Sequence, residues 1–195
     1  MRYDNEHKQR THQKLIEETS AAIRQHGPGN ISVAALMAKV GLTHGGFYAH
    51  FKSKDDLVAE TITYLLEERV ESFEKSLEGA DLSVALANYI DSYLSTMHRD
   101  TRDKGCAIAA LNGDVARMSN DTKTRFELGI QRSMNILSGV LIKLNKENPE
   151  ELAGSVLTEM VGALAVSRTL SNTELSAWLL NNTRISVKKR IGLGT

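Results

Sequence analysis

A chain of 195 residues with 41% apolar and 25% charged side chains has the composition of a globular protein with one large core or two small ones. It contains no uncharged apolar run of about 18 residues, so we expect no membrane span. No apolar run follows the basic start "MRYDNEHKQRTHQK", so we expect no secretory signal. We therefore expect a cytoplasmic location. Cys106 is the single cysteine, which excludes an internal disulfide and a cysteine-based zinc cluster.

The net charge is zero, but the charges are distributed unevenly. Residues 1–54 hold eight Lys and Arg against four Asp and Glu, together with five of the six histidines, whereas the remainder holds sixteen against twenty. The basic end is the candidate for contact with an anionic partner. A solvated surface explains an excess of four charges equally well.

The first two predicted helices lie in this basic end. Apolar or small residues at helical spacing indicate a first helix, namely Leu15, Thr19, Ala22 and Ile23. The stretch "HGPGN" at residues 26–30 ends this helix. A second, short helix is predicted from Ser32 to Val40, and Gly41 ends it.

A long helix follows. Ser53 and Asp56 form the S-x-x-D pattern of a capping box, which predicts the start of this helix. Its apolar positions continue at helical spacing to a stop near Gly79, through Leu57, Ile62, Leu65, Leu66, Val70, Phe73 and Leu77.

The rest of the chain predicts further helices and no strand. In "NPEE", Asn148 is expected to cap a helix that has Pro149 at its first position and that extends to about Leu170. The other predicted helices are 82–97, 105–118, 121–145 and 173 to about 190. The pattern therefore predicts an all-α fold.

The stretch "GLTHGGFYAHFKSKDDL", residues 41–57, has the spacing of a helix-turn-helix. Apolar residues stand on both sides of the Gly41 turn, namely Leu36, Val40, Leu42 and Phe47. Thr43 is expected to cap the second helix of the motif. Two adjacent glycines in a helix cost about 1 kcal/mol each relative to alanine, and close approach to a DNA groove would compensate for that cost.

The same stretch resembles the DNA-binding signature of TetR/AcrR-type transcriptional regulators, in which a glycine-ended turn, a recognition helix with "FY.HF" and a following "SK" recur together. The resemblance implies an N-terminal three-helix helix-turn-helix DNA-binding domain, residues 1–54. It also implies a C-terminal helical domain, residues 55–195, for regulation, ligand binding and dimerisation. Met37 departs from the family, which usually has a small alanine there.

The resemblance also implies which residues contact double-stranded operator DNA. Thr43, His44 and Gly45 would face the major groove, and four residues would hold the phosphates, namely Tyr48, His50, Lys52 and Lys54. Ser32 is a further DNA-binding candidate. Because few of these side chains reach base edges, part of the specificity is expected to come from DNA shape.

Several of these residues also have a purely structural interpretation. Phe47 and Phe51 are expected in the core, and Tyr48 could be buried rather than exposed. His44 and His50 lack a third ligand nearby in the sequence, so no metal site is predicted. Cys106 is either a buried small hydrophobic residue or a sensor thiol.

Two functions are expected of the C-terminal domain. The segment from Val156 to Leu170 has only two charged residues, which predicts that a homodimer buries it. The candidate interface residues are Val156, Met160, Ala163, Ser167, Leu175, Trp178 and Leu179. Apolar, adaptable residues are the candidates for binding a largely hydrophobic effector, and these are Leu66, Met97, Leu111, Phe126 and Met134.

No motif for catalysis is present, so the sequence predicts a protein that is not an enzyme and that needs no cofactor. It predicts a sequence-specific DNA-binding repressor that a small molecule releases from its operator. The alternative is a DNA-binding or chromosome-organising protein that needs no ligand and answers to a protein partner. An enclosed apolar cavity in the second domain would distinguish the two.

Overall fold

The N-terminal part of the chain consists of one long helix followed by three short helical segments. The computed structural model describes residues 2–79 and 81–194, beginning with α1, Arg2–His26. Gly27, with a φ of 79°, ends that helix, and the turn η1, Pro28–Asn30, leads to α2, Val33–Lys39. Gly41, with a φ of 76°, then turns the chain into the 3-10 helix η2, His44–Ala49.

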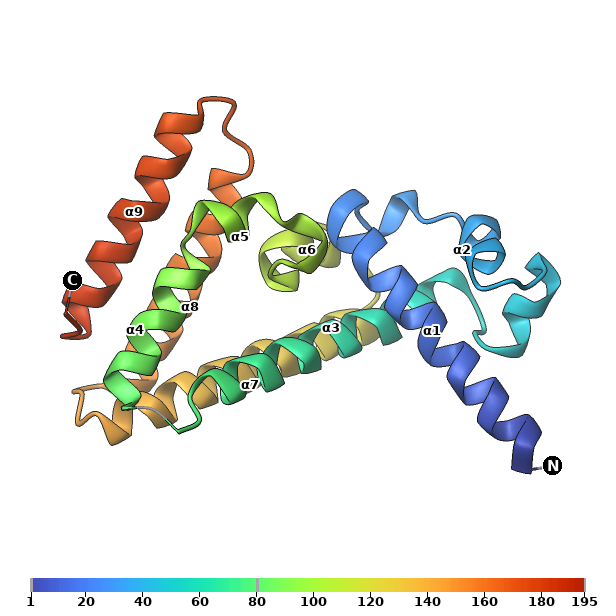
Figure 1. The fold of residues 1–195 in the computed structure, drawn as a ribbon, viewed down its shortest axis with the longest axis horizontal. Helices are drawn as coiled ribbons and strands as arrows, with labels where there is room; N and C mark the ends of the chain where they lie inside the picture. Colours follow the sequence, from blue (N-terminus) through green and yellow to red (C-terminus); the bar gives the residue numbers. More distant parts are fainter. Residues whose placement is uncertain (1, 80, 195) are drawn as a thin grey trace.

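The long helix α3, Lys54–Ser76, connects the two halves of the molecule (Figure 1). The Ser53 hydroxyl oxygen accepts a hydrogen bond from the Asp56 amide, as the S-x-x-D pattern predicts. The Asp56 carboxylate does not return to Ser53, however, and accepts instead from the Lys52 amide, 2.9 Å away. The first hydrogen bond of the predicted capping box is therefore present, and the second joins Asp56 to Lys52, one residue before Ser53.

The remaining elements are all helical, and the described residues contain no strand. The all-α prediction is therefore confirmed. The helices are α4 (Leu82–Tyr93), α5 (Thr96–Asp100), η3 (Arg102–Lys104), α6 (Ala107–Val115), α7 (Asn120–Lys143), α8 (Pro149–Ser167) and α9 (Thr173–Arg190).

Three local predictions are wrong. The predicted helix 82–97 is two helices, because the chain bends at Leu94 and the Ser95 hydroxyl caps α5 by accepting from the His98 amide. Asn148 adopts a left-handed conformation, and its side chain makes no capping bond. Thr43 likewise makes no side-chain capping bond, and the motif's second helix is the 3-10 helix η2.

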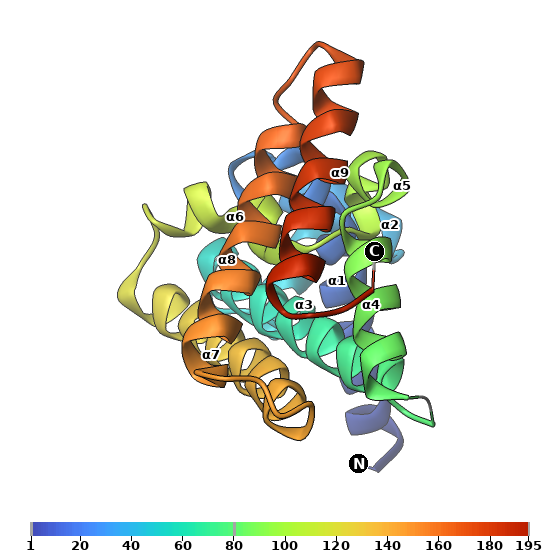
Figure 2. The same ribbon diagram turned by 90° about the vertical axis from the view of Figure 1, so that its left-hand side faces the viewer.

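The core of the C-terminal part is a layer of long helices. Helices α3 and α7 lie side by side, and α8 packs on α7 and on α9 (Figures 1 and 2). Close packing of α3 on α7 depends on Gly129, where an added Cβ would lie 2.6 Å from Cβ of Leu66. Gly129 is therefore required by the packing, not by its own backbone conformation.

This packing gives a prediction for stability. Gly129→Ala is expected to lower the free energy of unfolding by about 1–3 kcal/mol, because the new methyl group collides with Leu66. Gly139→Ala is the matched control in the same helix, since an added Cβ there meets no atom within 4 Å. The control is expected to be neutral or to stabilise by up to about 1 kcal/mol. Urea unfolding of both variants tests this, and equal effects would contradict the packing argument.

A second contact joins the two halves of the molecule. Besides the continuous helix α3, the turn η3 and the helix α6 pack against α1. Helix α6 also contacts α3 and α8, so it lies between the N-terminal helices and the C-terminal layer (Figure 1). The N-terminal helices therefore contact the rest of the chain through η3 and α6 as well as through α3.

Candidate nucleic-acid interface

The inner face of the helix-turn-helix is tightly packed. Phe47 and Phe51 are both 2% exposed, which confirms that they belong to the core. Met37 is fully buried, and its terminal carbon would lie 3.4 Å from a Cβ placed on Gly46. The larger Met37 is thus accommodated by the absence of a side chain at Gly46.

The outer face of the same motif is free. Thr43, His44 and Gly45 are exposed, and an added Cβ on Gly45 would meet nothing within 4 Å. Tyr48 is 68% exposed, so the alternative that it is buried is wrong. The packing explains Gly46, but nothing within the chain requires a glycine at position 45. That residue allows another molecule to approach the backbone closely.

The segment that follows offers donors for phosphate oxygens. The side chain of Lys52 is exposed, and the positive end of the α3 dipole lies at Ser53 and Lys54. Ser32 is exposed, and its hydroxyl oxygen caps α2 by accepting from the Ala35 amide at 3.3 Å. Its hydroxyl proton remains available for donation to an external acceptor.

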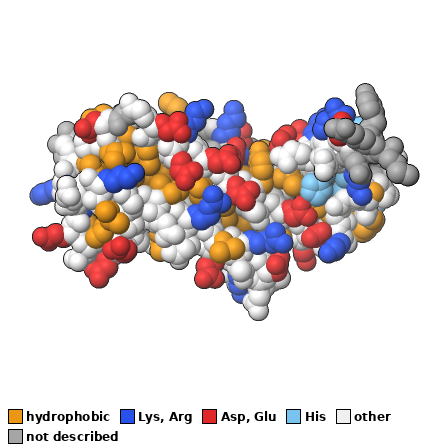
Figure 3. Space-filling view, turned by 90° about the horizontal axis from the view of Figure 1, so that it is seen from below, with side chains coloured by type: hydrophobic (Ala, Val, Ile, Leu, Met, Phe, Trp, Pro, Cys, Tyr) orange, Lys and Arg blue, Asp and Glu red, His pale blue; other side chains and the backbone are white. Residues whose placement is uncertain are grey.

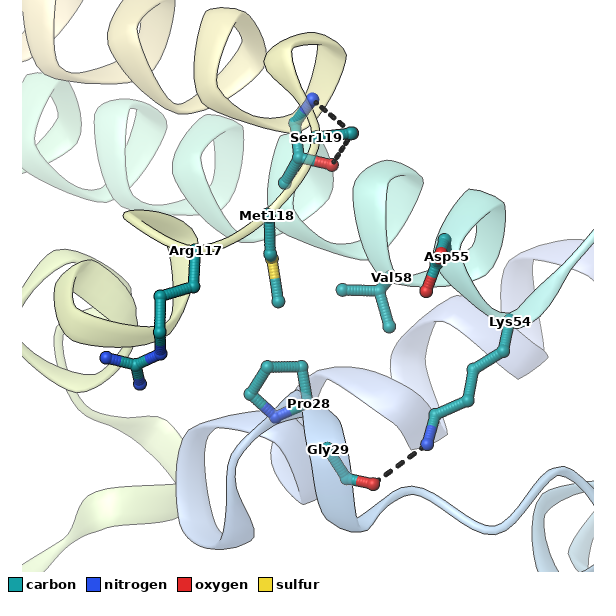
Figure 4. A pocket seen from close by; sticks show the side chains of 9 residues that line it. Pro28, Gly29, Lys54, Asp55, Val58, Arg117, Met118 and Ser119 are labelled. Atoms are coloured by element: carbon teal, nitrogen blue, oxygen red, sulfur yellow. Dashed lines mark hydrogen bonds between the residues drawn. The ribbon is translucent and has the colours of Figure 1, made fainter.

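Lys54 is held within the chain. Its Nζ donates to the backbone carbonyl of Gly29, 2.9 Å away, across a cavity of about 330 Å³ at the junction of the two halves (Figure 4). The other walls of this cavity come from Pro28, Val58, Arg117 and Met118. This hydrogen bond uses one of the three donors of the Lys54 ammonium group, so the predicted phosphate contact stays a prediction.

His50 faces α1 instead of the solvent-exposed side of the motif. Its Nδ1 atom is buried and has no hydrogen-bond partner, and its ring lies 6.3 Å from that of His12. Burial lowers the pKa of His50, and the nearby His12 and Lys8 lower it further. His50 therefore favours the neutral form, which still carries one N–H donor, so its predicted phosphate contact stays a prediction.

Charged side chains at this end of the molecule are visible on its surface. Figure 3 shows Lys, Arg and His side chains at the end formed by the N-terminal helices. His12 Nε2 lies 2.8 Å from a carboxylate oxygen of Glu60, so this histidine is already engaged within the chain. In the part of the chain that the structure describes, no group of three His, Cys, Asp or Glu side chains could hold a metal ion.

The predicted effector residues do not meet in one cavity. Leu66, Leu111 and Phe126 are at most 6% exposed and Met134 packs against the core, whereas Met97 is 78% exposed. Met97 borders a cavity of about 460 Å³ between α3, α4 and α6, and Leu66 borders a different one between α3 and α7. The other three pack in the core, so the described cavities do not bring the predicted set together.

The predicted dimer residues separate into two groups. Val156, Met160, Ala163 and Ser167 are at most 7% exposed within one chain, because α7 and α9 cover them. The expectation that only a second chain could bury this helix is therefore wrong, and these four residues belong to the core. Leu179 is half-buried.

A different set forms the exposed apolar face of α8 and α9. Leu175 and Trp178 are 47% and 59% exposed, and the sequence analysis missed two similar residues, Val166 and Ile185. Positions 175, 178 and 185 share one face of α9, since they are separated by three and seven residues. That spacing is the signal that would have identified Ile185.

Comparisons with known proteins agree with this geometry. Residues 15–61 match the model of the bacterial regulatory proteins of the tetR family. A curated relative, the HTH-type transcriptional regulator BetI of Yersinia pestis, is 26% identical over 92 residues, which cover 43% of this chain. They cover 46% of the relative, so the match spans about half the length of that protein.

Solved structures share the fold over almost the whole chain. The reduced form of E. coli NemR has a TM-score of 0.80 and 18% identity, with 92% of this chain and 95% of that chain covered. A TetR-family transcriptional regulator from Cytophaga hutchinsonii has a TM-score of 0.79 and 17% identity, with 93% and 95% covered. The resemblance to TetR/AcrR-type regulators is confirmed. In the described residues, no helix has the length and apolar character to cross a membrane.

Proposed function

We propose that this chain is a TetR/AcrR-type repressor of transcription, which its N-terminal domain and its fold support. It would act in the cytoplasm as a homodimer bound to operator DNA, and a small molecule would release it from that DNA. The observation that carries the proposal is the free outer face of residues 43–48, where Gly45 leaves the backbone open. We assign DNA binding to residues 1–54 and regulation and dimerisation to residues 55–195.

Recognition of DNA would combine few base contacts with several phosphate contacts. Thr43 and His44 carry the donors and acceptors that can reach base edges in the major groove. Tyr48, Lys52 and Ser32 carry exposed polar groups that suit phosphate oxygens. Lys54 and His50 contribute to the positioning of η2 and α3 through their internal packing, and not as the principal phosphate ligands.

Two copies are needed to place two recognition segments on one duplex. The exposed apolar face of α8 and α9 is suited to an isologous contact, in which the same surface of each chain meets across a two-fold axis. The two η2 segments would then enter successive major grooves about 34–36 Å apart. Operator DNA is accordingly expected to be close to palindromic.

Release by a small molecule would use the two connections between the halves. Helix α3 joins them directly, and η3 and α6 pack against α1. An effector that favours one arrangement of α6 would change the spacing of the recognition segments. The coupling would be about 1–3 kcal/mol, so operator affinity would fall by about 5- to 150-fold.

Selection from a random-sequence DNA library tests the proposal, with fluorescence anisotropy measured on the enriched duplex. We expect a near-palindromic site and a log affinity that falls linearly with log salt. His44→Ala should change which bases are preferred, whereas Lys52→Ala should weaken binding to all DNA sequences alike. Enrichment of no sequence by the wild-type protein would contradict the proposal.

A further inference from the structure

A cavity of about 460 Å³ lies where α1, α3, α4, α5 and α6 meet. Among the described residues, four buried side-chain nitrogen or oxygen atoms lack a hydrogen-bond partner. Three of these four belong to residues that line this cavity, namely Nε of Arg24, Nε of Arg69 and the hydroxyl of Tyr93. Buried polar groups are ordinarily paired, so a cluster of unpaired donors at one cavity indicates a missing acceptor.

Arg69 supplies a positive charge that the chain does not neutralise. Its guanidinium group lies 5.0 Å from the ring centre of Tyr93 and is hydrogen-bonded to Tyr89, and among the described residues it has no ion pair. The carboxylate among the lining residues, that of Glu68, is paired with Arg24 at 3.2 Å. A guanidinium group remains charged at all ordinary pH values.

The hydroxyl of Tyr93 is the second unpaired donor. Tyr93 is only 4% exposed, and its hydroxyl lies beside the Cys106 thiol without a hydrogen bond of normal geometry. Because burial raises the pKa of Tyr93 well above its ordinary value, the hydroxyl keeps its proton. It is therefore an unpaired donor in a residue of the cavity wall.

The remaining polar groups around the cavity carry no negative charge that could replace a ligand. His98 Nε2 accepts from the Cys106 amide at 3.1 Å, so its Nδ1 carries the proton and donates to the Tyr93 carbonyl at 2.7 Å. Burial lowers the pKa of His98, and the charges of Arg168 and Arg69 lower it further. Lys104 adds a second cation at the exposed rim.

We propose that this cavity binds a small organic carboxylate, with one oxygen accepting from Arg69 Nε and the other from the Tyr93 hydroxyl. The inference rests on the proposed function, because it names the chemical class of the effector. It replaces the largely hydrophobic ligand expected from the sequence. A monoanion balances the single unpaired guanidinium group of Arg69, whereas the second negative charge of a phosphate dianion would have only Lys104, at the exposed rim, to offset it.

The body of the ligand would lie against Tyr89, Leu65 and Met97, which line the same cavity. Arg24, on α1, also lines this cavity. A ligand that draws Arg69 and Arg24 toward one anion would therefore act on a helix of the DNA-binding domain. This arrangement provides a direct path from the cavity to the recognition segment.

Calorimetry on the full chain without DNA tests the site. The probes are acetate, butyrate and benzoate, each compared with its neutral amide at matched ionic strength, and phenyl phosphate. We expect at least one carboxylate to bind at least tenfold more tightly than its amide. Arg69→Met and Tyr93→Phe should each weaken that binding at least tenfold, whereas the control Arg132→Met on α7 should not.

Tyr93→Phe keeps the variant test valid if Arg69→Met fails to fold, since it removes only an unpaired hydroxyl. Equal affinity for every carboxylate and its amide would overturn the proposal, and so would unchanged binding in Tyr93→Phe and Arg69→Met. Tighter binding of phenyl phosphate than of benzoate would overturn the choice of a carboxylate. Operator affinity of the unliganded wild-type protein reports separately on the proposed function.

Discussion

Replacing Trp178 with glutamate is expected to convert the protein to a monomer of 21.5 kDa and to weaken operator binding by at least about 100-fold. Trp178 is 59% exposed in the middle of the apolar face of α8 and α9, where a buried carboxylate would find no partner. Loss of the dimer removes the second half-site from each binding event. Sedimentation equilibrium and fluorescence anisotropy measure the two effects.

Leu128→Glu is the matched control for this prediction. Leu128 is 61% exposed on α7, outside the face formed by α8 and α9, so it undergoes the same change in polarity and charge at a different surface. The control should remain a dimer and retain its affinity for DNA. A Trp178→Glu protein that stays dimeric, or a Leu128→Glu protein that dissociates, would place the interface elsewhere.

Gly45→Glu is expected to reduce operator affinity by at least about 30-fold, or about 2 kcal/mol, because it places a carboxylate against the DNA backbone. The fold should be unaffected, since Gly45 is exposed and an added Cβ there meets no atom within 4 Å. The melting temperature and the dimer should therefore match those of the wild-type protein. Anisotropy titration at two salt concentrations measures the loss.

Gly113→Glu makes the same chemical change at another exposed glycine. Gly113 lies on α6, and an added Cβ there also meets nothing within 4 Å. Because the two variants have the same net charge, their comparison removes the general effect of one added negative charge. Similar losses in both variants would show that the outer face of η2 does not contact DNA.

Local signals in the sequence were sufficient to predict most of the fold. The predicted helix from residue 173 to about 190 matches α9, whose Asn172 cap accepts from the Leu175 amide. The break at Ser95 was missed because its capping bond to His98 interrupts an otherwise helical apolar pattern. Such a cap is a single side-chain hydrogen bond. Whether the helix ends there or continues depends on how the surrounding residues pack.

The candidate site was predictable only where the structure depends on neighbouring residues. Exposure of Thr43, His44 and Tyr48 follows from the short motif itself. Lys54 donates to Gly29 and the His50 ring lies near His12 of α1, both far away in the sequence, and no local pattern indicates those contacts. The same reason explains the ligand set, since a cavity depends on how distant helices pack.

The dimer residues show a further limit. An apolar helix such as α8 must be buried, but its sequence does not distinguish burial by its own chain from burial by a second copy. In this fold α7 and α9 cover most of α8, and the free apolar surface lies on the outer side of α9. Hydrophobicity alone therefore selected Val156 and Met160, whereas the exposure of Val166 on α8 is known only from the packing.

Hydroxyl-radical footprinting of the wild-type dimer on its selected duplex tests the central claim most directly. The account predicts two symmetric protected segments on one face of the DNA, centred on major grooves about one helical turn apart. The Gly45→Glu protein should give no protection at the same concentration, while Gly113→Glu should give the wild-type pattern. Protection that is absent for the wild-type protein, or that is equally strong with Gly45→Glu, would contradict the assignment of residues 43–48 as the DNA-reading segment.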